Sequence, residues 1–171
     1  MRELLNTDAY YVSKKEKETF NSYWGNNATI KDPDGKIRNL LDEKEIKDRL
    51  QNYKYIINYI KDTKPQSVLD LGCGLGDMLL SLDGIKNRTG VDNDIKFAKE
   101  RSKEINWIDA NVEEYCSNIN HFDVIICHHV IEHLKEPVKF VQKIFKLMKE
   151  DAIFIVSTPD FDCGLARLFN K

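Results

Sequence analysis

A glycine-rich turn that directly follows an apolar run constrains this chain more than any other part of its sequence. The run reads Val68-Leu69-Asp70-Leu71-Gly72-Cys73-Gly74-Leu75-Gly76-Asp77. Glycine at every second position lets the backbone turn sharply and approach a ligand without interference from Cβ atoms. Asp70 restricts the choice of ligand, because a carboxylate at this turn would repel the pyrophosphate of a dinucleotide. The run therefore predicts a buried strand that leads into a site for a cationic, not a phosphorylated, cofactor.

Short apolar runs alternate with helical patterns through most of the chain. Strands are expected at residues 67–71, 89–91, 105–108, 122–127 and 152–156. Their apolar residues are continuous and do not alternate, which is typical of a parallel sheet covered by helices on both faces. Apolar residues at intervals of three or four predict an amphipathic helix over 42–61, and a second helix begins near Pro137. The pattern predicts a doubly wound, mainly parallel α/β sheet.

The length of the chain bounds its organisation. A chain of 171 residues suffices for one core. We expect residues 1–62 to form an N-terminal arm and the amphipathic helix, with a turn at 32–35, and residues 63–171 to form the cofactor-binding domain. Two aromatic residues of the arm, Tyr23 and Trp24, are either a lid over the site or core residues.

Charge and composition exclude several classes of partner. The 26 basic and 28 acidic residues nearly cancel, which gives no reason to expect nucleic acid or an anionic membrane as a partner. No stretch approaches the roughly 20 apolar residues of a membrane span, and no signal peptide is recognisable. The four cysteines form no C-x-x-C pair, so we expect reduced thiols. These features predict a cytoplasmic protein that acts on a small molecule.

The glycine spacing differs from that of a dinucleotide site. Gly72-x-Gly74-x-Gly76 closes one residue sooner than G-x-G-x-x-G. With Asp70, it resembles motif I of the class I S-adenosylmethionine-dependent methyltransferases, and the resemblance extends from about Gln66 to Asp160. S-adenosylmethionine carries an ammonium and a sulfonium group, as the carboxylate requires. The resemblance implies a Rossmann-like domain with cofactor-binding residues Asp70, Gly72, Cys73, Gly74, Gly76, Asp92, Asn93, Asp109, Ala110, Asn111, Cys127 and His128.

The resemblance also assigns roles at the first two strand ends. The backbone around Gly72 and Gly74 would cradle the methionine part of the cofactor, with Asp70 near its amino group. Asp92 closes the second strand, where a carboxylate can accept hydrogen bonds from a ribose diol. The structural alternative for this segment is a cap on the helix that begins near Ile95, a role that we assign to Asp94.

The third strand end is the expected adenine site. Asp109 matches the acidic residue that family members place against the adenine amino group. The backbone N–H of Ala110 or Asn111 would then reach a ring nitrogen. Asn111 is equally well explained as a helix N-cap, with Glu114 three residues later.

Three histidines in the segment after the fourth strand are the candidate catalytic residues. This segment reads Cys127-His128-His129-Val130-Ile131-Glu132-His133-Leu134 and resembles the methyltransferase subgroup that includes ubiquinone O-methyltransferases and sugar methyltransferases. Nucleobase amino-methyltransferases would show Asn-Pro-Pro-Tyr instead. An alcohol must lose its proton during methylation, and histidine suits that task. We expect His129 or His133 to be the general base and His128 to lie near the transferred methyl.

The same segment allows two alternatives. His133 can be a helix-start residue held by hydrogen bonds. On a helix, His129, Glu132 and His133 would share a face and could bind a divalent metal. We include no metal in the predicted site.

The C-terminal part raises the questions of completeness and acceptor. Members of the family continue past the fifth strand with a helix and an antiparallel hairpin, so we expect this chain to be truncated there; otherwise the arm or a second subunit, in a homodimer, would cover the edge. Ser157-Thr158-Pro159 and the segment 166–169 resemble methyltransferases found with glycan-assembly enzymes, which favours a sugar hydroxyl.

The sequence thus predicts an S-adenosylmethionine-dependent O-methyltransferase of a small molecule or glycan precursor. Two alternatives remain. One is a non-catalytic S-adenosylmethionine- or nucleoside-binding module of the same fold. The other is a nicotinamide dehydrogenase, which Asp70 and the glycine spacing disfavour.

Overall fold

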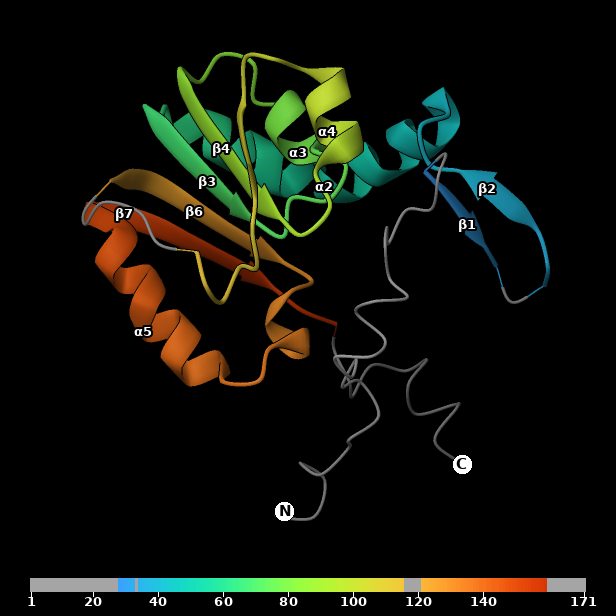
Figure 1. Cartoon of the computed structure of the whole chain (residues 1–171). Helices are drawn as coiled ribbons and strands as arrows, with labels where there is room; N and C mark the ends of the chain where they lie inside the picture. Colours follow the sequence, from blue (N-terminus) through green and yellow to red (C-terminus); the bar gives the residue numbers. More distant parts are fainter. Residues whose placement is uncertain (1–27, 33, 116–120, 160–171) are drawn as a thin grey trace.

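The computed structural model describes residues 28–32, 34–115 and 121–159. Figure 1 shows the course of the chain. Its elements are β1 (Thr29–Lys31), β2 (Ile37–Asn39), α2 (Glu43–Thr63), β3 (Ser67–Leu71), α3 (Asp77–Leu80), β4 (Asn87–Asp92), α4 (Lys96–Arg101), β5 (Asn106–Asp109), β6 (Phe122–His128), the 3-10 helix η2 (Ile131–His133), α5 (Pro137–Leu147) and β7 (Met148–Ser157).

A five-stranded parallel sheet in the order β5-β4-β3-β6-β7 forms the centre of the molecule. All five predicted strands are present, and residues 67–71 match β3 at both ends. β7 is longer than predicted, because it begins directly after α5 and its register against β6 shifts between Phe122 and Val124. The predicted doubly wound α/β class is confirmed.

Helices cover both faces of this sheet, as the continuous apolar strands require. α2, α3 and α4 lie on one side and α5 lies on the other (Figure 1). Alternate residues of β3 point into the two layers: Val68 packs with Ile60 and Leu79 on the first face, and Leu69 packs with Ile144 on the second. Each face therefore has its own apolar core, with β3 at the centre of both.

The N-terminal segment contributes a small antiparallel hairpin, β1–β2. Its turn confirms the signal at 32–35, since Gly35 adopts a φ of 88° and donates its N–H to the carbonyl of Asp32. Ala28 and Leu40 of this region pack with Leu75 of the glycine loop and with Phe97 of α4. The hairpin therefore lies against the loop that the sequence assigns to the cofactor. Tyr23 and Trp24 lie outside the described residues.

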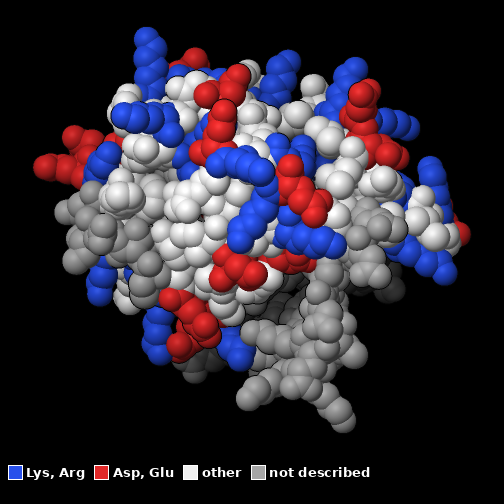
Figure 2. Space-filling model, turned by 45° about the horizontal axis from the view of Figure 1, so that its top comes forward, with Lys and Arg blue, Asp and Glu red and all other residues white. Residues whose placement is uncertain are grey.

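The surface carries charges of both signs. On the face in Figure 2, acidic and basic side chains are interspersed. None of the helices among the described residues is long and apolar enough to cross a bilayer.

The strand order reverses between β3 and β6. The chain builds β3, β4 and β5 outward in one direction and then returns to place β6 on the other side of β3. In open α/β sheets, ligands bind beyond the carboxyl ends of the strands at such a reversal. The carboxyl ends of β3 and β6, with the neighbouring end of β4, are therefore the expected place of a site.

We expect Gly72→Ala to lower the free energy of unfolding by about 2–4 kcal/mol, as the sum of a left-handed backbone and overpacking. Gly72 has a φ of 81°, and a Cβ there would overlap Cγ2 of Val130. Urea unfolding measures the loss. The matched control is Gly84→Ala, because a Cβ at Gly84 meets nothing within 4 Å. Adding Val130→Ala to the Gly72→Ala variant should restore only the stability that is lost to overpacking. Equal stability of Gly72→Ala and Gly84→Ala would contradict this explanation.

Candidate functional site

The glycine loop after β3 forms the floor of the site. Gly72, Gly74 and Gly76 have φ values of 81°, 53° and 80°. The N–H groups of Gly72 and Cys73 donate to the carbonyl oxygen of Val91, at 2.8 and 3.2 Å. Gly76 N–H donates to Cys73 O at 2.9 Å. These three N–H groups already donate, two of them to β4 and one within the loop, and α3 has only four residues. They are therefore not part of a row of free N–H groups that could bind a pyrophosphate.

Asp92 at the end of β4 fixes this loop from the side. Its Oδ2 accepts the N–H of Gly74 at 2.9 Å, and its Oδ1 accepts the N–H of Asp94 at 3.1 Å. The sequence interpretation placed Asp94 as the cap of the next helix, and that assignment is wrong: the N-cap residue of α4 is Ile95, without a side-chain cap. Asp92 instead joins the glycine loop to the turn after β4, because its two oxygens accept the N–H groups of Gly74 and Asp94. Each carboxylate oxygen retains a lone pair, so the ribose role stays a prediction.

Asp70 is a buried acid at the carboxyl end of β3, with 4% of its surface exposed. Burial, and secondarily the negative charge of Asp92, raise the pKa of Asp70 to about 7. No described residue donates a hydrogen bond to its carboxyl group. A cation placed beside Asp70 would stabilise the ionised form, whereas an anion would meet two carboxylates. The chemistry of this floor therefore fits a cationic ligand group.

The third strand end is more open. Asp109 ends β5 and is exposed. The N–H of Ala110 donates to the carbonyl of Asp92 at 3.0 Å, which leaves Asn111 as the backbone candidate for a ring nitrogen. The Asn111 side chain accepts the N–H of Glu113 at 2.8 Å. It caps a turn and not the helix that the sequence suggested, because the described residues 111–115 form a turn.

Aromatic rings line the β6 side of the site. The rings of His128 and Tyr53 meet edge to face with centroids 5.0 Å apart, and His128 meets His129 in the same way at 4.2 Å. Burial, and then the neighbouring His129, lower the pKa of His128 to about 4. Nδ1 of His128 is buried and has no hydrogen-bond partner among the described residues. His128 is therefore a neutral imidazole at pH 7.

His129 differs from His128 in its exposure and its partner. Half of its side-chain surface is exposed, and its Nδ1 lies 3.5 Å from Oε1 of Glu132. His129 holds a left-handed φ of 54°, fixed by its N–H donating to the carbonyl of Ser157 at 2.8 Å. A carboxylate on Nδ1 orients an imidazole so that Nε2 can accept a proton.

The helical face on which the metal alternative depends is not formed. Residues Ile131–His133 are a single 3-10 turn, and His133 is exposed. Among the described residues no three His, Cys, Asp or Glu side chains gather closely enough to hold a metal ion.

The two cysteines assigned to the cofactor site are buried and reduced. Burial, followed by the charge of Asp70, raises the pKa of Cys73 well above its usual range and that of Cys127 to about 12. Both remain thiols at neutral pH, so their contribution to a ligand is packing and backbone.

A buried ion-pair network beside the glycine loop was missed by the sequence analysis. Oδ2 of Asp77 accepts a hydrogen bond from Nε of Arg49 at 2.6 Å, and its Oδ1 forms an ion pair with Nη1 of Arg101 at 2.6 Å. Arg49 also donates to the carbonyl of Leu40 at 2.7 Å, and its Nη1 is buried without a hydrogen-bond partner among the described residues. Tyr53 lies one turn further along α2, and burial, followed by the negative charge of Asp77, raises its pKa. The signal available in the sequence was a lone arginine among the apolar positions of the helix.

Comparisons with known proteins agree with this geometry. The family model described as "Methyltransferase domain" matches residues 53–171. The ubiquinone biosynthesis O-methyltransferase of Rickettsia canadensis is 27% identical over 157 residues, which cover 86% of this chain and 64% of that protein. Against a Rickettsia bellii protein of the same name the match covers 48% of the relative. The chain thus spans about half to two thirds of the length of these curated relatives.

Solved structures share the fold. The PH0226 protein from Pyrococcus horikoshii aligns with a TM-score of 0.62 and 25% identity, over 77% of this chain and 62% of that one. The plantazolicin methyltransferase BpumL, solved with a pentazolic desmethylPZN analogue and SAH, aligns with a TM-score of 0.58 and 22% identity, over 70% of this chain and 50% of that one.

We expect Asp70→Asn to stabilise the ligand-free protein at pH 8 by about 1–3 kcal/mol and to have little effect at pH 4. The folded-state pKa of about 7 lies above the ordinary value of 3.8. The folded protein therefore keeps a proton that the unfolded chain loses, and the contribution of Asp70 to stability falls as pH rises from about 4 to about 7. The Asp70→Asn side chain cannot ionise, so the variant does not lose this part of its stability as the pH rises. Urea unfolding at pH 4, 6 and 8 tests it.

The matched control is Asp83→Asn, because Lys61 lowers the pKa of the exposed Asp83 and the sign is opposite. A gain for the Asp83 variant equal to that of the Asp70 variant at pH 8 would refute the burial argument.

Proposed function

Because the chain belongs to the methyltransferase-domain family of class I S-adenosylmethionine-dependent methyltransferases, we propose that it methylates an oxygen atom of a small molecule. S-adenosylmethionine supplies, when bound, a methyl group already activated by a sulfonium centre. The observation that carries the proposal is the buried Asp70 beneath a glycine loop whose three glycine N–H groups already donate to β4 or within the loop. This floor suits a cationic amino acid nucleoside and is hostile to a diphosphate.

Different residues of the site bind the two charged groups of the cofactor's amino acid part. The Asp70 carboxylate is the partner for an ammonium group. Arg49 is the partner for a carboxylate, because its Nη1 is a buried donor with no described acceptor. Asp77 holds Arg49 in place through Nε, and Arg101 shares the charge of Asp77. Asp92 and Asp109 remain our candidates for the ribose and the adenine.

His129 is our candidate general base, with Glu132 as its orienting carboxylate. Its exposure lets Nε2 reach an acceptor, whereas the pKa of about 4 makes His128 a weak base. Proton removal from the acceptor hydroxyl then leaves an oxygen nucleophile, and the neutral ring of His128 supports desolvation nearby. His133 is exposed on the 3-10 turn and is a secondary candidate.

The acceptor that best suits this wall is an aromatic alcohol. The rings of Tyr53, His128 and His129 meet edge to face. Val130 and Ile131 follow with partly buried apolar side chains. The curated relatives carry the name ubiquinone biosynthesis O-methyltransferase, which agrees with an aromatic acceptor. The sugar hydroxyl favoured by the sequence rests on Ser157-Thr158-Pro159 and on residues 166–169, of which the second segment lies outside the described part. It stays a second prediction.

The remaining expectations are part of the same proposal. Residues 63–171 form the cofactor-binding domain, to which Arg49 of residues 1–62 adds a partner for the cofactor carboxylate. Residues 1–62 also contribute to the acceptor side, where Leu40 and Ala28 contact the loop region. We place the protein in the cytoplasm with a small-molecule acceptor and no nucleic acid or membrane partner. A homodimer is an untested prediction.

In a binding test, S-adenosylhomocysteine should bind with a Kd in the micromolar range, about −8 kcal/mol, and NAD should not bind below about 1 mM. Asp70→Asn should lower the affinity for S-adenosylmethionine at least about tenfold at pH 8. Wild-type affinity should rise with pH through about 7, where Asp70 ionises. Isothermal titration calorimetry at pH 6, 7 and 8 measures all three, and tight NAD binding without S-adenosylhomocysteine binding would overturn the proposal.

5′-Methylthioadenosine, which lacks the amino acid group, is the matched control ligand. Arg49→Gln should lower the affinity for S-adenosylhomocysteine and leave the affinity for 5′-methylthioadenosine unchanged. Arg101→Gln breaks the same network without removing the unpartnered nitrogen. If the two arginine variants weaken both ligands equally, Arg49 has only a structural role.

For the chemical step, His129→Gln should lower kcat by about 10²- to 10⁴-fold while the KM for S-adenosylmethionine stays within about twofold. His133→Gln is the control, and its kcat should fall by less than about fivefold. The assay measures the release of S-adenosylhomocysteine. The wild-type protein is first screened against phenols, catechols and sugars, and the variants are then compared on the acceptor that it methylates. Cofactor binding without turnover on any acceptor would favour the non-catalytic module.

A further inference from the structure

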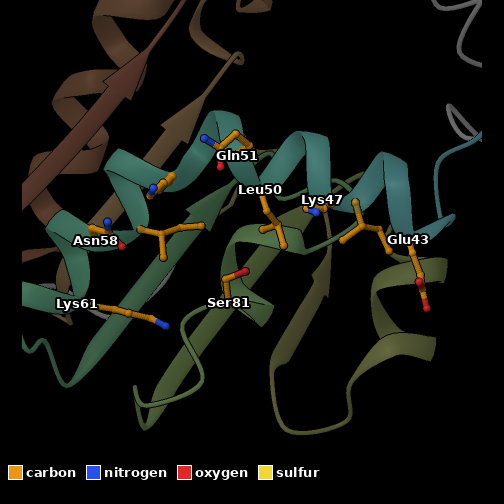
Figure 3. A pocket seen from close by; sticks show the side chains of 10 residues that line it. Glu43, Lys47, Leu50, Gln51, Asn58, Lys61 and Ser81 are labelled. Atoms are coloured by element: carbon orange, nitrogen blue, oxygen red, sulfur yellow. The ribbon is translucent and has the colours of Figure 1, made fainter.

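A second surface of the molecule, unrelated to the cofactor site, is a groove along α2. Its volume is about 460 Å³, and we call it the α2 groove. Leu50 of α2 and Ser81 at the end of α3 face each other across it, and Glu43 and Lys61 lie at its two ends (Figure 3). The lining residues are Glu43, Ile46, Lys47, Leu50, Gln51, Lys54, Ile57, Asn58, Lys61 and Ser81.

The groove has an apolar floor and a cationic rim. Ile46, Leu50 and Ile57 form the floor, and Ile57 is 8% exposed. Lys47, Lys54 and Lys61 recur every seven residues, which is two helical turns, so they form one row along the helix. Glu43 is the single acidic residue of the lining.

The cations of this row are not neutralised within the described part of the protein. Lys47 and Lys54 have no carboxylate within ion-pair distance among the described residues. Lys61 has one contact, 3.4 Å from Asp83, whose side chain is 82% exposed. Such an exposed pair contributes little and is easily exchanged for another carboxylate.

We propose that the α2 groove binds an acidic amphipathic helix of a partner protein. Glu43 and Lys61 are 18 positions apart on the helix, so the groove offers about 27 Å along its axis. A helix of that length with apolar residues on one face would fill the floor, and its flanking carboxylates would meet the lysine row.

The other occupants fit less well. A second copy of α2 would set one lysine row against another. Nucleic acid gains nothing from the apolar floor, and the surface of a bilayer does not enter a groove between α2 and the end of α3. The chain also carries a net charge of −2. The Arg49 and Tyr53 side chains, which serve the cofactor site, are absent from the groove lining. A helix in the groove should therefore leave cofactor binding unchanged.

The test uses the full chain and a fluorescent synthetic helix of about 18 residues, with Leu at i, i+4, i+7 and i+11 and Glu on both flanks. Anisotropy should give saturable binding that weakens as NaCl rises from about 0.05 to 0.5 M. Lys47→Glu with Lys54→Glu should weaken the peptide at least about tenfold. The control Lys44→Glu with Lys103→Glu makes the same charge change at exposed positions outside the groove, and should change binding less than about twofold.

A scrambled peptide of equal composition and a Lys-for-Glu peptide should not bind. The proposal is overturned if the two double variants behave alike, if the Lys-for-Glu peptide binds as well, or if ultracentrifugation shows that the groove variants only abolish self-association. S-adenosylhomocysteine affinity, measured in the same samples, separates this proposal from the function above: the peptide result stands even if the cofactor does not bind.

Discussion

One carboxylate organises the candidate site. Asp92 accepts the N–H of Gly74 through one oxygen and that of Asp94 through the other, and so ties the glycine loop to the end of β4. The N–H groups of Gly72 and Cys73 donate to Val91 of the same strand, and that of Gly76 donates to Cys73 within the loop. The positive ends of these dipoles are thereby withdrawn from any ligand, and the negative groups dominate the floor.

This arrangement has a cost in stability that the proposed function explains. Asp70 is buried beside Asp92, and both carboxyl groups have raised pKa values for which burial is the first cause. A buried acid without a described donor destabilises the empty protein when it ionises. Strain at His129, with its φ of 54°, belongs to the same edge of the sheet. Such departures from a stable core are typical of sites that bind charged ligands.

α2 connects the parts of the molecule that the parallel sheet keeps separate. One side of the helix packs Ile57 and Ile60 into the core. Arg49 reaches Asp77 beside the glycine loop, and Tyr53 meets His128 at the end of β6. The same helix carries the lysine row of the α2 groove. One side of α2 thus forms a wall of the candidate site, and another side forms the α2 groove.

The sequence by itself determined the strands, the doubly wound class and the glycine loop, because continuous apolar runs and residues with special backbone freedom act locally. It also placed Asp70, Asp92 and the three histidines at strand ends. Only the tertiary structure decided which groups meet. The Arg49–Asp77 pair joins residues 28 positions apart, and the different surroundings of His128 and His129 depend on Tyr53 and Glu132. Burial and charge contacts between distant segments set these properties, and no local pattern encodes them.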